Sequence, residues 1–127
     1  MGEKKKILII DDEENFTKLV KMNLEATGKY EVKIENKGIL GFSAAKEFKP
    51  DLILLDILMP DMEGSEVISQ LNDDMDTKNI PVVFLTAIIK EKEVKESGGV
   101  IAGHRFIAKP VSADKLIEVI ERTLISD

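Results

Sequence analysis

Apolar residues in this chain fall into short runs separated by segments with helical spacing. Uninterrupted apolar runs occur within residues 6–10 (KILII), 51–56 (DLILLD) and 80–87 (IPVVFLTA). Short runs of this kind between polar or turn residues are typical of strands buried on both faces of a sheet. Residues 30–35 (YEVKIE) alternate between apolar and polar instead, which predicts an edge strand with one wetter face. A fifth, short strand is expected at residues 105–108.

Helical patterns fill the gaps between these strands, and Asp11 or Asp12 is expected to cap the first helix. Alternating strands and helices predict βαβ units, a parallel sheet and right-handed crossovers, and therefore an α/β fold in one domain over residues 1–127. Residues 100–103 fit neither pattern. The first expected helix has helical spacing at Phe16, Leu19, Val20, Asn23 and Leu24 and ends at Thr27-Gly28. Further helices are expected at 38–48, 65–71 and 90–97, and a last one starts at Ser112 or Asp114.

Composition narrows the classes of function. The 127 residues are 43% hydrophobic and 33% charged, with a net charge of -6, which argues against non-specific nucleic-acid binding by charge. The absence of cysteine excludes disulfides, thiolate nucleophiles and cysteine metal sites. No stretch approaches the ~20 apolar residues that span a bilayer, and no signal-peptide core is present. We therefore expect a cytoplasmic protein without membrane association.

The polar residues that end the predicted strands indicate the chemistry. Asp11-Asp12, Asp56, Thr86 and Lys109 each follow or end an apolar run. The carboxyl ends of parallel strands meet at one edge of the sheet, where ligands bind. Carboxylates gathered there repel one another, and a hard divalent cation such as Mg²⁺ relieves this repulsion. A carboxylate nucleophile, a metal, a lysine and a hydroxyl together suit the acceptance of a phosphoryl group.

Four motifs, in this order and spacing, carry a resemblance to a known family. They are ILIIDDEE, DLILLDILMPDMEG, PVVFLTA and FIAKP. With them the chain resembles a response-regulator receiver domain over essentially its whole length. The resemblance implies the flavodoxin-like (βα)5 fold, a doubly wound parallel five-stranded sheet with strand order 2-1-3-4-5. It also implies phosphorelay signalling, with a sensor histidine kinase or a histidine phosphotransfer protein as the partner.

The resemblance assigns roles to individual residues. Asp56 would accept the phosphoryl group. Thr86 and Lys109 would contact the phosphoryl oxygens, helped by the backbone N–H groups of Leu58 and Ala87, and the Lys109–Pro110 peptide bond would be cis. Mg²⁺ would be bound directly by Asp12, Asp56 and the backbone carbonyl of Leu58, and through water by Asp11.

The resemblance also implies a switch. Phe106 stands where the family has its switch aromatic, and a shift of Thr86 toward the phosphoryl group would let its ring turn inward. The surface affected would be that of the fourth helix (90–97), the fifth strand (105–108) and the last helix, and the same surface would serve for a homodimer. Leu58 and Ile88 flank the acceptor site, where relatives often carry polar side chains, so we expect slow loss of the phosphoryl group. The glycine-rich residues 97–103 depart from the family pattern.

Other functions fit the residues less well. A flavodoxin-like electron carrier needs a phosphate-cradling loop after the first strand, where this chain has four acids. A phosphatase of the haloacid-dehalogenase type needs a second aspartate at position 58, and a dinucleotide-binding dehydrogenase needs G-x-G-x-x-G. The remaining alternative is a pseudo-receiver, in which the same fold serves only as a protein-binding module.

Overall fold

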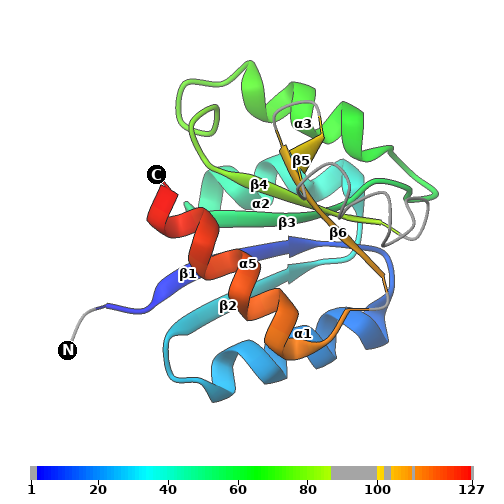
Figure 1. Ribbon diagram of the computed structural model, residues 1–127. Coiled ribbons are helices and arrows are strands. Elements are labelled where there is room, and N and C mark those ends of the chain that lie inside the picture. Colours follow the sequence, from blue (N-terminus) through cyan, green and yellow to red (C-terminus); the bar gives the residue numbers. More distant parts are fainter. Residues whose placement is uncertain (1–2, 87–99, 102–103, 110, 127) are drawn as a thin grey trace.

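The computed structural model describes residues 3–86, 100–101, 104–109 and 111–126. The predicted helix at 90–97, with Ala87, Ile88 and Pro110, lies outside the described residues. Figure 1 shows helices packed on both faces of a single twisted sheet. The elements are β1 (Lys5–Ile10), α1 (Glu14–Ala26), β2 (Tyr30–Glu35), the 3₁₀ helix η1 (Gly38–Leu40), α2 (Gly41–Phe48), β3 (Leu52–Asp56), α3 (Gly64–Asn72), β4 (Val82–Thr86), β5 (Val100–Ile101), β6 (His104–Ala108) and α5 (Ala113–Ser126).

The sheet has the order β2-β1-β3-β4-β6-β5. The first five strands of this order pair in parallel, which confirms the predicted fold and the order 2-1-3-4-5 when β6 is counted as strand 5. The sequence did not predict β5, a two-residue strand that pairs antiparallel with β6 at the outer edge. A strand of two residues is too short to show any periodicity.

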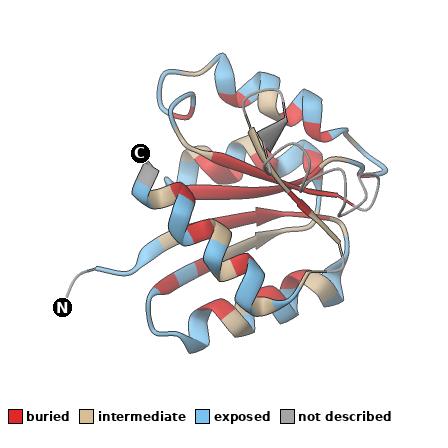
Figure 2. Cartoon of the chain, in the orientation of Figure 1, coloured by how far each residue is buried: buried red, intermediate tan, exposed pale blue. Residues whose placement is uncertain are grey.

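Two apolar layers, one on each face of the sheet, form the core. In β1 and β3 alternate side chains point to opposite faces, as the two-residue period of a strand requires. Because helices cover both faces, both strands are buried along their apolar length, as the red central strands in Figure 2 show. One layer joins Ile7, Ile9, Leu52 and Leu54 to Val20 and Leu24 of α1 and to Leu116 and Ile120 of α5. The other joins Leu8, Ile10, Ile53 and Leu55 to Ala44 and Ala45 of α2 and to Val67 and Leu71 of α3.

The ends of the helices depart in part from the prediction. Glu13, rather than Asp11 or Asp12, is the N-cap of α1, and its side chain makes no capping hydrogen bond. Asp11 Oδ1 instead accepts a hydrogen bond from the Glu13 N–H at 2.9 Å, in the turn before the helix. Gly28 follows α1 with φ of 76°, a conformation that favours glycine. Ser112, rather than Asp114, caps the start of α5: its Oγ accepts a hydrogen bond from the Lys115 N–H at 3.2 Å.

Candidate phosphoryl-acceptor site

The carboxyl ends of neighbouring parallel strands bring the predicted site residues to one edge of the sheet. Asp56 is the last residue of β3 and is paired in register with Leu85 of β4. Asp11 follows β1, and Lys109 follows β6, where its backbone N–H donates to the Thr86 carbonyl at 2.9 Å. The main-chain ladder therefore sets the positions of residues that are far apart in the sequence.

Three carboxylates gather at this edge. One oxygen from each of Asp11, Asp12 and Asp56 lies within 4.8 Å of the other two. Asp11 is fully buried, Asp56 is 6% exposed, and Asp12 is more open to solvent. Buried charges of like sign are costly unless an opposite charge stands close to them. The arrangement therefore requires positive charge at the same place.

Lys109 supplies one positive charge inside the cluster. Its Nζ lies 2.7 Å from Asp11 Oδ2, 2.7 Å from Glu13 Oε1 and 3.9 Å from Asp56 Oδ2. The Lys109 side chain is only 9% exposed, so solvent screens these contacts weakly. The ammonium also stands over the Phe16 ring, 4.6 Å from its centroid.

The charges in the cluster shift one another's pKa values. Burial, reinforced by the charge of Asp11, raises the pKa of Asp56 to about 7, while Lys109 opposes the shift. Burial also raises the pKa of Asp11, against the lowering effect of its contact with Lys109. For Lys109, burial lowers the pKa, but the contacts with Asp11 and Glu13 outweigh it and the net shift is upward. The cluster is thus short of positive charge even with its lysine in place.

The cluster fits a hard divalent cation. Its donors are all carboxylate oxygens, which Mg²⁺ prefers over nitrogen and sulfur ligands. Asp11 Oδ2 makes no well-directed hydrogen bond to any described residue, although the Lys109 ammonium lies beside it. A buried carboxylate oxygen with spare acceptor capacity, next to two further acids, is suited to a cation or to a water bound to one.

The loop after β3 is fixed close to Asp56. The Gly64 N–H donates to the Ile57 carbonyl at 2.7 Å, and a Cβ at position 64 would stand 2.7 Å from the Asp56 carbonyl oxygen. Only glycine allows α3 to start so close to β3. The Asp61 carboxylate accepts hydrogen bonds from the N–H groups of Gly38 and Ile39 at 3.2 and 3.0 Å, and so ties the loop to η1.

The other residues named from the sequence lie at different depths. Thr86 ends β4 and is 1% exposed. Phe106, in β6, is half-buried and stacks on Phe84 with ring centroids 5.0 Å apart. Leu58, just beyond Asp56, is 56% exposed. Ala87, named for its backbone N–H, is not among the described residues.

Glu13 and Asp61 were not singled out from the sequence. Glu13 belongs to a run of four acids, in which nothing distinguishes a carboxylate that meets Lys109 from one in solvent. The bond between Glu13 and Lys109 joins residues 96 positions apart. Only the strand order brings the two side chains together.

Comparison with known proteins agrees with this geometry. Residues 7–121 match the family described as the response regulator receiver domain. The chain belongs to this family. Receiver domains of two-component systems act in phosphorelay signalling and are not enzymes that turn over a metabolite. They generally bind Mg²⁺ through an acidic cluster and interact with kinases or phosphotransfer proteins.

Individual relatives resemble this receiver along nearly its whole length. The polar-differentiation response regulator DivK of Brucella anthropi is 37% identical over 122 residues, which cover 94% of this chain and 96% of DivK. A CheY-like receiver domain protein from Methanospirillum hungatei superposes with a TM-score of 0.81 at 30% identity, covering 98% of this chain and 96% of the other. Chemotaxis protein CheY4 of Vibrio cholerae superposes with a TM-score of 0.81 at 25% identity, covering 95% and 99%. Within the part of the receiver that the structure describes, no helix is both long enough and apolar enough to cross a bilayer.

Proposed function

We propose that Asp56 is the phosphoryl acceptor of this receiver and that a phosphohistidine is the donor. The P–N bond of the phosphohistidine breaks, its electron pair stays on the imidazole nitrogen, and a new bond joins phosphorus to a carboxylate oxygen of Asp56. The observation that carries this proposal is a strand-end carboxylate beside two further acids, with the Lys109 ammonium 3.9 Å away. The donor is proposed to be a sensor histidine kinase or a histidine phosphotransfer protein in the cytoplasm.

The residues around Asp56 have distinct proposed roles. Asp12, Asp56 and the Leu58 carbonyl would bind Mg²⁺ directly, and Asp11 through water. When bound, this ion supplies positive charge that keeps Asp56 ionised and stabilises charge on the transferring group. Lys109 offers a second positive charge from a side chain that is almost buried. Its backbone bond to Thr86 is consistent with both residues serving one group of phosphoryl oxygens. The N–H groups of Leu58 and Ala87 are proposed as further donors.

Phosphorylation is proposed to act on partners through Thr86 and Phe106. Thr86 is buried at the end of β4, and Phe106 stacks on Phe84 in the middle of the same strand pair. A shift of Thr86 would therefore have to be transmitted along only two residues of β4 to reach the stacked rings of Phe84 and Phe106. Phosphorylation would shift an equilibrium between two arrangements of this region. The surface formed by β6, α5 and the helix expected at residues 90–97 is the proposed site for the downstream partner or for a homodimer.

Chemical labelling tests the proposal. Incubation with acetyl phosphate and Mg²⁺ should label the protein at Asp56, and Asp56→Asn should reduce labelling to background while EDTA prevents it. Asp73→Asn, at an exposed aspartate beyond the end of α3, should label like the wild type. A wild-type protein that folds but takes no label would be a pseudo-receiver, and the proposal would be lost.

The phosphorylated protein should lose its phosphoryl group slowly. Leu58 is apolar and 56% exposed beside the acceptor, so it cannot orient a water molecule for attack on phosphorus. We expect a lifetime of minutes or longer, and a shorter one in Leu58→Asn. Leu19→Asn, at a leucine 54% exposed on α1, should leave the decay unchanged. Decay of the wild type within seconds, measured after the phosphodonor is removed, would contradict this expectation.

A further inference from the structure

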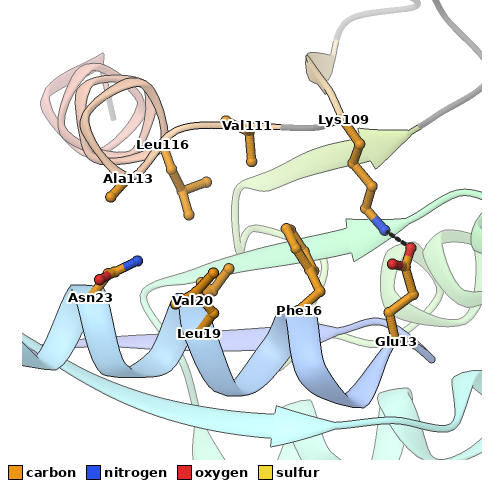
Figure 3. Close-up of a pocket in the computed structure, with 9 residues that line it drawn as sticks. All are labelled: Glu13, Phe16, Leu19, Val20, Asn23, Lys109, Val111, Ala113 and Leu116. Atoms are coloured by element: carbon orange, nitrogen blue, oxygen red, sulfur yellow. Dashed lines mark hydrogen bonds and ion pairs between the residues drawn. The ribbon is translucent and has the colours of Figure 1, made fainter.

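Glu13 lies outside the acidic cluster but contacts its lysine. The residue precedes α1, and its Oε1 accepts a hydrogen bond from Lys109 Nζ at 2.7 Å. A groove of about 380 Å³ runs between α1 and α5. Figure 3 shows the Glu13–Lys109 pair at one end of it. The Phe16 ring also lines the groove, and its centroid lies 4.6 Å from Lys109 Nζ.

Lys109 has closer partners on the β1–α1 side than on the acceptor side. Its distances to Asp11 and Glu13 are both 2.7 Å, against 3.9 Å to Asp56. One N–H of the ammonium is donated to Glu13, and the ammonium lies equally close to the Asp11 carboxylate. To approach a phosphoryl group on Asp56 as closely as it now approaches Asp11 and Glu13, the ammonium must move away from at least one of these two carboxylates.

The two carboxylates differ in how easily they release the lysine. The Asp11 side chain is 0% exposed, so water cannot replace Lys109 around it. The Glu13 side chain is 58% exposed, and once released it is hydrated at little cost. The Glu13 contact is therefore the one that Lys109 can exchange.

We propose that Glu13 is a positioning residue, which holds the Lys109 ammonium while Asp56 is unmodified and yields it to the phosphoryl group. The exchange is a competition between two anions for one buried cation, so Glu13 works against the phosphorylated state. This inference rests on the proposed function of Asp56. Beyond that function, it assigns to the Glu13 carboxylate an effect on how readily Asp56 is phosphorylated.

Binding of beryllium trifluoride with Mg²⁺, which mimics a phosphoryl group on a carboxylate, tests the exchange. Glu13→Gln keeps the size of the side chain and removes its charge. It should bind the mimic ~2- to 5-fold more tightly than the wild type, the range expected for a half-exposed ion pair. Glu14→Gln makes the same change of charge one residue further on, at an exposed side chain, and should bind like the wild type. Glu13→Ser also lacks the carboxylate but favours the start of α1, and should behave like Glu13→Gln.

The NMR signal of the Lys109 ε-methylene supplies a readout that a purely structural role would not change. In the free protein this signal should differ between the wild type and Glu13→Gln, and with the mimic bound the two signals should coincide. The inference would be overturned if both glutamine variants bound the mimic equally, or if the two Lys109 signals differed by the same amount in both states. Failure of the wild type itself to bind the mimic would instead refute the proposed function of Asp56.

Discussion

Replacing Asp56 with asparagine is expected to raise the free energy of unfolding of the metal-free protein by about 2–4 kcal/mol at pH 8. Burial and the charge of Asp11 raise the pKa of Asp56 to about 7, from 3.8 for an ordinary aspartate. At pH 8 the carboxylate is therefore ionised in a place that disfavours its charge. Asparagine has nearly the same shape and no charge, so the folded state no longer carries that cost.

The size of this effect depends on pH. Between about pH 4 and pH 7 the folded protein keeps a proton on Asp56 that the unfolded chain has lost, so the wild type loses stability as the pH rises through this window. The advantage of Asp56→Asn should thus be largest above pH 7 and disappear near pH 4. Urea denaturation in EDTA at pH 4 and pH 8 measures it.

A matched variant separates this effect from a general change of charge. Asp73→Asn removes one negative charge at an exposed position, and should change the free energy of unfolding by less than ~0.5 kcal/mol at either pH. If Asp56→Asn were no more stable than the wild type at pH 8, the carboxylates at the sheet edge would not repel one another as the geometry requires.

The buried strands, and the residues that end them, could be predicted from the sequence. The runs KILII and DLILLD are apolar on both faces because helices cover both faces of the sheet, so the pattern of burial is visible in the sequence itself. Once these runs are parallel neighbours, Asp11 and Asp56 must meet at the same edge. The resemblance to receiver domains added the strand order, which the pattern alone does not specify.

The local start of α1 and the partners of the site residues could not be predicted in this way. A capping rule assigns Asp11 or Asp12 to the helix, but the buried Asp11 faces Lys109, and the helix begins after Glu13. Two hydrogen bonds join distant segments through exposed acids: Asp61 accepts one from η1, and Glu13 accepts one from Lys109. Such contacts depend on the tertiary arrangement rather than on any periodicity of the chain.

Replacing Lys109 with methionine is expected to lower the free energy of unfolding by about 3 kcal/mol in EDTA at pH 8, opposite in sign to the effect of Asp56→Asn. Methionine is unbranched like lysine and keeps most of its apolar length, so the change chiefly removes the ammonium that stands over the Phe16 ring. Asp11 would then be a fully buried carboxylate without its counter-charge, beside Asp56 with a pKa already raised to about 7.

Magnesium should reverse most of this loss. In the wild type a cation entering the cluster must compete with Lys109 for Asp11, whereas in Lys109→Met the carboxylates are free of that contact. Saturating Mg²⁺ should therefore stabilise the variant more than the wild type and narrow the gap between them.

Lys46→Met provides the control for the loss of a lysine. Lys46 pairs with Asp74 at 2.9 Å, but its side chain is 38% exposed and lies away from the acidic cluster. Its replacement should cost at most ~1 kcal/mol, and Mg²⁺ should not alter that cost. An equal response of both lysine variants to Mg²⁺ would mean that Lys109 and the cation do not compete for the same carboxylates, since only Lys109 lies among them.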